Sequence, residues 1–135
     1  MLEKIDHLGI VVHDLKSAMA RYAALSGHPA DHVEDVIEQK VRVAMFNVGE
    51  SRIELLMATA PDSPVAKFIK NRGEGLHHVC FKVANLDEAV VRLQREGMQI
   101  LPDAGAKGAE GSRIAFLHPK STAGVLIELA ETSTP

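Results

Sequence analysis

The sequence predicts an α+β fold made of two copies of one β-α-β-β-β module. Three observations predict it: an internal repeat, short β-branched segments, and a capped helical segment after the first strand of each copy. A shift of 71 positions superposes most of the first half on the second, and a shift of 74 superposes the closing strands. The superposed pairs are His7 with His78, Leu8 with Val79, Leu15 with Leu86, Ala18 with Ala89, and residues 42–46 and 53–55 with residues 113–117 and 127–129.

Length and composition fit one soluble globular domain over residues 1–135, with 46% apolar and 24% charged residues. Within it we expect one module at about residues 1–58, a linker at about 59–75 and a second module at about 76–131. Together the modules are expected to form a curved mixed sheet.

The first module begins with a strand at residues 5–12, which are short and β-branched. Asp14 is placed to cap a helix with apolar residues at helical spacing, and Gly27 is placed to end it in a left-handed conformation. A hairpin is expected next, with strands at residues 40–48 and 52–58 around Gly49-Glu50-Ser51.

The second module repeats this order, beginning with a strand at residues 77–83. Asn85, followed three residues later by Glu88, resembles a capping box, and Gly97 corresponds to Gly27. The other expected elements are a short helix beginning near Pro64 in the linker and strands at residues 113–117 and 124–129.

Alternation along the strands places one histidine and one glutamate of each module on the sheet face that its helix does not cover. These residues are His7 and Glu54 in the first module and His78 and Glu128 in the second. The opposite face, packed under the helices, is expected to hold Leu8, Ile10, Val12, Ile53, Leu55 and Met57, and Val79, Phe81, Val83, Val125, Ile127 and Leu129.

Two modules facing one another bring these four polar residues together in a cleft. Imidazole nitrogen and carboxylate oxygen suit Mn, Fe, Co, Ni or Zn, so the sequence predicts a metal cleft. The alternative is that the histidines are hydrogen-bonded core residues and the glutamates are solvated. Because all four occupy repeat-equivalent positions, we favour the metal site.

Several blocks, in this order along the chain, are similar to one known family. They are residues 5–12, 48–56, 62–69, 73–78, 116–121 and 124–129. Over nearly the whole chain, the sequence resembles the vicinal oxygen chelate superfamily and, within it, the methylmalonyl-CoA epimerase family. The resemblance implies the vicinal oxygen chelate fold, a small acyl-CoA substrate, a homodimer, and interconversion of (2R)- and (2S)-methylmalonyl-CoA.

The same resemblance implies a divalent ion, with cobalt favoured over Mn, Ni, Zn, Fe or Mg, bound by His7, Glu54, His78 and Glu128. A metal that binds the carboxylate and thioester oxygens stabilises enolate charge, and epimerisation then moves the C2 proton between faces. Some relatives have a second glutamate, proposed as an acid/base, where this chain has Val43. Valine cannot transfer protons. Glu128 remains a candidate base as well as a ligand, and the second proton-transfer group is left open between a metal-bound water and an unidentified residue.

Three residues are candidates for substrate binding. Arg113 is a candidate for the free carboxylate, and Lys120 and Ser121 are candidates for a CoA phosphate. We interpret His77 as a packing or supporting residue, because it points away from His78.

Two other enzyme classes and one binding class remain open. A glyoxalase I-like lyase has the same fold and a similar ligand set, whereas an extradiol dioxygenase keeps three protein ligands around Fe(II). A bleomycin-resistance type binding protein needs no metal, and the four ligand-type residues argue against it.

Charge and segment patterns exclude further classes. The net charge of −3 lacks the basic footprint of a nucleic-acid-binding protein. The single cysteine, Cys80, fits a reducing compartment. Because no signal peptide or membrane span is recognisable, we expect a cytoplasmic protein without membrane association.

Overall fold

The computed structural model describes residues 1–132, which form eight strands, three α-helices and three short 3-10 helices. The chain divides into two compact units. The first unit is His7–His77, and the second unit is Met1–Asp6 together with the chain from His78 onward. Two strands therefore cross these bounds, and each is described below with the unit that holds most of its pairing, although residues 2–6 and 75–77 fall in the other unit. Each unit contains one copy of the repeat.

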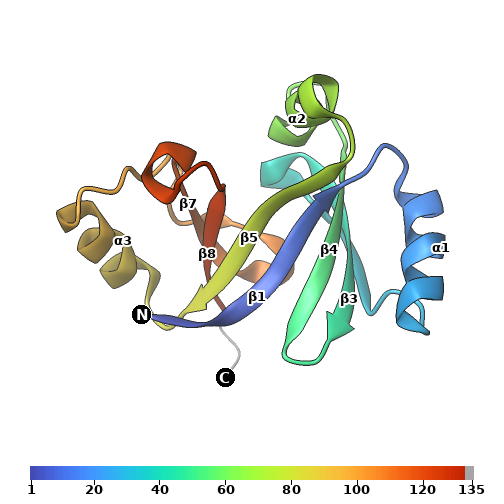
Figure 1. Cartoon of the computed structure of the whole chain (residues 1–135), viewed down its shortest axis with the longest axis horizontal. Helices are drawn as coiled ribbons and strands as arrows, with labels where there is room; N and C mark the ends of the chain where they lie inside the picture. Colours follow the sequence, from blue (N-terminus) through green and yellow to red (C-terminus); the bar gives the residue numbers. More distant parts are fainter. Residues whose placement is uncertain (133–135) are drawn as a thin grey trace. The chain divides into compact units, whose positions relative to one another are not determined.

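The first unit is a four-stranded mixed sheet with the strand order β2-β3-β4-β1. Strands β2, β3 and β4 are antiparallel, and β1 runs parallel to β4. Helix α1 packs on β3 and β4 (Figure 1), and α2 packs on β4. The elements are β1 (Leu2–Val11), α1 (Leu15–Ser26), β2 (His32–Val36), a 3-10 helix (Ile37–Gln39), β3 (Val41–Val48), β4 (Ser51–Ala58) and α2 (Pro64–Arg72).

The second unit repeats this topology with the strand order β5-β8-β7-β6. Strand β5 runs parallel to β8, the other pairs are antiparallel, and α3 packs on β7 and β8 (Figure 1). The elements are β5 (Gly75–Val83), α3 (Leu86–Arg95), β6 (Ala106–Lys107), β7 (Arg113–Leu117) and β8 (Ile127–Glu131), with 3-10 helices at Ala109–Gly111 and Pro119–Thr122. The predicted α+β fold of two β-α-β-β-β modules is confirmed.

The predicted helix ends are confirmed by their hydrogen bonds. The Asp14 carboxylate accepts from the Ser17 amide at 3.2 Å, and the Asn85 side chain accepts from the Glu88 amide at 3.0 Å. Gly27 has φ +84°, the left-handed conformation that allows its amide to donate to Ala23. Local sequence therefore determines where α1 and α3 begin and where α1 ends.

Each unit has its own apolar core between helix and sheet. The core of the first unit includes Val12, Leu15, Ala44, Phe46 and Leu55. The core of the second unit includes Val83, Leu86, Leu93, Leu117 and Leu129. The predicted faces are confirmed at the buried residues Val12, Leu55, Val83 and Leu129 and at the partly buried residues that pack against them, Ile10, Ile53, Met57, Phe81 and Ile127. Leu8 and Val79 are also partly buried but do not belong to either core cluster.

The last strand differs from its prediction. It begins at Ile127 rather than at residue 124, because the 3-10 helix before it is followed by Ala123 and Gly124 at φ +57° and +91°. The chain is still turning there, so Val125 is 46% exposed and lies outside the apolar face that we assigned to it.

None of the helices in residues 1–132 combines the length and the apolar composition needed to cross a lipid bilayer.

Candidate metal centre

In the first unit, His7 and Glu54 lie on neighbouring parallel strands. Glu54 of β4 is opposite Gly9 of β1, and His7 is two residues before Gly9 on the same face. The Nε2 atom of His7 lies 3.4 Å from Oε1 of Glu54. Both residues are 5% exposed, so the imidazole and the carboxylate form a buried pair.

The second unit contains the equivalent pair, His78 and Glu128. Glu128 of β8 is opposite Cys80 of β5, and His78 is two residues before Cys80. The Nε2 atom of His78 lies 3.0 Å from Oε1 of Glu128, and the two residues are 3% and 6% exposed. Two parallel strand pairs in the same register thus produce two matching His–Glu pairs.

Each glutamate of the two pairs has an apolar cross-strand neighbour. Met45 is the cross-strand neighbour of Glu54, and Phe116 has that position beside Glu128. The Phe116 ring packs edge-on against the His78 ring, with centroids 6.0 Å apart. In such an environment a carboxylate is costly to bury unless it is hydrogen-bonded, paired with a cation or bound to a metal.

The donor atoms of each pair fit a divalent metal. Two donors that each lie about 2.1 Å from one ion and subtend a right angle are about 3 Å apart. The distances of 3.0 Å and 3.4 Å between imidazole nitrogen and carboxylate oxygen are close to that separation. Each unit therefore presents one imidazole and one carboxylate whose separation suits binding of a divalent ion by that pair.

Val43 lies on the same sheet face as the first pair. It is two residues before Met45 on β3 and is 1% exposed. Its cross-strand neighbours are Glu34 on β2 and Leu56 on β4. This buried position thus holds a side chain that cannot exchange protons.

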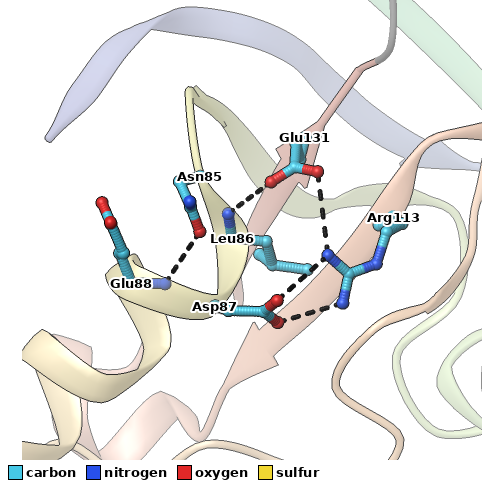
Figure 2. A network of polar contacts seen from close by, with 6 residues as sticks. All are labelled: Asn85, Leu86, Asp87, Glu88, Arg113 and Glu131. Carbon is cyan, nitrogen blue, oxygen red and sulfur yellow. Dashed lines mark hydrogen bonds and ion pairs between the residues drawn. The ribbon is translucent and has the colours of Figure 1, made fainter.

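Arg113, a predicted substrate-binding residue, forms ion pairs within the second unit (Figure 2). Its guanidinium lies 3.0 Å from the Asp87 carboxylate and 3.7 Å from the Glu131 carboxylate. The hydrogen bond from Arg113 to Asp87 raises the pKa of the guanidinium above its ordinary value. Glu131 also accepts from the Leu86 amide at 2.7 Å, so Arg113 is tied to the start of α3.

Lys120 and Ser121 lie in the 3-10 helix between β7 and β8. The Lys120 amide donates to Nδ1 of His118 at 3.0 Å, and the Gln99 amide donates to Oγ of Ser121 at 2.9 Å. The Lys120 side chain is exposed. These contacts fix the backbone of the turn and leave the ammonium group at the surface.

His77 and Asp6 each directly precede a predicted histidine ligand. The ring of His77 packs edge-on against Phe68 with centroids 4.8 Å apart, as expected for a packing residue. Asp6, which sequence reasoning missed, is a buried carboxylate in the second unit, and one of its oxygens lies within 4.8 Å of Cys80 Sγ. A carboxylate inside an apolar strand, directly before a predicted ligand, was the available signal.

Residues 6–116 match the family described as the glyoxalase/bleomycin resistance protein/dioxygenase superfamily. The chain belongs to this superfamily. A mitochondrial methylmalonyl-CoA epimerase of Mus musculus is 37% identical over 96% of this chain and 74% of its own length. An ethylmalonyl-CoA/methylmalonyl-CoA epimerase of Cereibacter sphaeroides is 35% identical over 97% and 99%.

A solved structure leads to the same group within the superfamily. It is a variant of Streptomyces coelicolor methylmalonyl-CoA epimerase in complex with 2-nitronate-propionyl-CoA. It is 38% identical to this chain with a TM-score of 0.92, and the alignment covers 99% of this chain and 100% of the other. Sequence and fold together thus make the chain a member of the methylmalonyl-CoA epimerase family of enzymes.

Proposed function

We propose that this protein interconverts (2R)- and (2S)-methylmalonyl-CoA by moving the C2 proton. The observation that carries the proposal is the pair of buried, register-matched His–Glu sites, His7 with Glu54 and His78 with Glu128. Relatives that bear the epimerase name and align over nearly the whole chain support the same substrate class.

The four residues are proposed to bind one divalent ion, with cobalt as the first candidate and Mn, Ni, Zn, Fe or Mg as alternatives. Their donor types suit these ions, and each pair has its nitrogen and oxygen atoms at a suitable separation. A bound ion supplies Lewis-acid stabilisation for negative charge on the substrate oxygens. The residues themselves fix the ligand atoms in an apolar environment, where electrostatic interactions are strong.

Glu128 is proposed to exchange the C2 proton in addition to binding the metal. A carboxylate can accept and return a proton, whereas Val43 offers no second carboxylate at the position where some relatives have glutamate. A mechanism with two glutamates at these positions therefore does not apply to this chain.

The acyl-CoA portion has further candidate contacts. Lys120 and Ser121 stay candidates for a CoA phosphate, since the Lys120 ammonium is exposed on a fixed turn. Arg113 stays a candidate for the substrate carboxylate, which would have to compete with Asp87 and Glu131. By analogy with the family, we also propose a homodimer in the cytoplasm.

The test is a comparison of two substrates. With cobalt added, the protein should epimerise methylmalonyl-CoA and should leave the methylglyoxal–glutathione hemithioacetal unchanged. Turnover of the hemithioacetal alone would assign the protein to the glyoxalase-like lyases of the same superfamily. The two reactions are followed by chiral chromatography of the acyl group and by ultraviolet absorbance of the lyase product.

A further inference from the structure

Helix α2 of the first unit presents three cations and has no acidic residue between its first and last residues. Lys67, Lys70 and Arg72 are exposed, and the helix contains neither Asp nor Glu. Within residues 1–132, none of the three forms an ion pair. Two other cations of the unit are paired: Lys40 contacts Asp62, and Arg42 pairs with Asp35. In a chain of net charge −3, α2 is thus a local cationic surface.

Helix electrostatics explains only part of this surface. Lys70 and Arg72 lie in the last turn, where cations interact favourably with the helix dipole. Lys67 lies outside that turn and is three residues before Lys70, so the two ammonium groups are neighbours on one face. Like charges at this spacing destabilise a helix. A bound anion would turn their repulsion into attraction to a common partner.

The position of α2 is fixed at both ends by the strands that carry the proposed ligands. At its start, the Ser63 hydroxyl accepts from the Val65 amide at 3.2 Å, and buried Val65 anchors the helix, which packs on β4. At its end, the Arg72 guanidinium lies 5.8 Å from the Phe68 ring centroid, and Phe68 packs on His77. Helix α2 therefore connects the strand of Glu54 with the strand of His78 (Figure 1).

We propose that Lys67 and Lys70, assisted by Arg72, bind the phosphate groups of the CoA carrier. This inference rests on the proposed function and assigns the part of the substrate remote from the reacting carbon. The pantetheine arm separates the thioester from the phosphates, so a phosphate site belongs away from the His–Glu pairs. Lysine ammonium groups are compact charges that bind phosphate through charge-assisted hydrogen bonds.

The test measures binding of free CoA and of pantetheine, which lacks the nucleotide phosphates, by isothermal titration calorimetry. The variant is Lys67→Gln/Lys70→Gln, and the matched control is Arg92→Gln/Arg95→Gln, which removes two cations at the same spacing from α3. We expect the α2 variant to bind CoA about tenfold more weakly, as for two partly exposed ion pairs. The control should bind CoA within about twofold of the unmodified protein, and pantetheine binding should not change.

Three outcomes would overturn the proposal. CoA affinity could be unchanged in the α2 variant, it could fall equally in the α3 control, or the loss could extend to pantetheine. If the α2 variant no longer sedimented with phosphatidylserine vesicles, while the unmodified protein did and CoA affinity was unchanged, α2 would be assigned to binding an anionic membrane surface instead. Because binding is measured without turnover, failure of the epimerase assignment leaves this test intact. A parallel Lys120→Gln variant distinguishes the contribution of α2 to CoA affinity from that of the turn before β8.

Discussion

The carboxylate of Glu128 lies 3.0 Å from the imidazole of His78, and both residues are almost completely buried. The same register on the parallel pair β1 and β4 places Glu54 3.4 Å from His7. A buried carboxylate needs a compensating partner, and the divalent ion that we propose would supply one to each pair.

Cobalt should stabilise the fold through both pairs. At a free concentration about a hundredfold above its dissociation constant, a ligand of the native state adds about 2.7 kcal/mol to the free energy of unfolding. We expect this gain in urea titrations of the unmodified protein and its loss in His78→Ala. His118→Ala, in a histidine outside the two pairs, is the control and should keep the gain. An equal gain in His78→Ala would exclude His78 as a ligand.

The core of the first unit should depend strongly on Phe46. This side chain is completely buried between α1 and the sheet, so Phe46→Ala removes its packing and leaves a cavity. The expected loss is about 3–5 kcal/mol of unfolding free energy, measured by chemical denaturation. Leu25→Ala, at a 75% exposed position on α1, should change stability by less than about 0.5 kcal/mol. Similar losses in both variants would contradict the assigned core.

The repeat made the register of the His–Glu pairs predictable. Once His7 and Glu54 are assigned to strands, the alternation of side chains along a strand determines which sheet face each occupies. The internal repeat then assigns the equivalent positions, His78 and Glu128, to the same face of the second module. Helix ends were predictable for a similar reason, since the caps at Asp14 and Asn85 are local. The meeting of the two pairs at one ion stays a prediction.

Features set by tertiary contacts were not predictable. Strand β2 is an edge strand whose sequence includes Glu34 and Asp35, so it lacks the apolar pattern of a buried strand. Strand β6 is only two residues long. The ion pairs of Arg113 connect positions that are far apart in the sequence, so no local pattern predicts them.

The Asp35–Arg42 pair predicts a pH effect at the edge of the first sheet. The hydrogen bond from Arg42 lowers the pKa of Asp35 below its ordinary 3.8. The contribution of the Asp35–Arg42 pair to stability is therefore fully present above the unfolded-state pKa of Asp35. It is lost as the pH falls through the lower pKa that Asp35 has in the folded state. In an NMR titration, Arg42→Gln should raise the Asp35 pKa toward 3.8, and Arg21→Gln should not. An unchanged pKa in Arg42→Gln would rule out this pair as the cause.

The start of α3 should depend on Glu131. Its carboxylate accepts from the Leu86 amide and also contacts Arg113 (Figure 2). Removing this partner in Glu131→Ala should cost about 1–2 kcal/mol, comparable to loss of a helix cap. Hydrogen exchange at the Leu86 amide should accelerate more in Glu131→Ala than in Glu131→Gln, which keeps an acceptor oxygen. Exchange at the unmodified rate in Glu131→Ala would contradict this role.

The most direct test of the central claim is deuterium incorporation at C2 of methylmalonyl-CoA in D2O, followed by mass spectrometry against an enzyme-free blank. We predict that the cobalt-loaded protein incorporates deuterium and that Glu128→Gln, loaded to the same metal content, is slower by about a hundredfold or more. Exchange at the unmodified rate in the metal-loaded variant would show that Glu128 is not the base. Absence of exchange in the unmodified protein with every divalent ion tested would contradict the epimerase assignment itself.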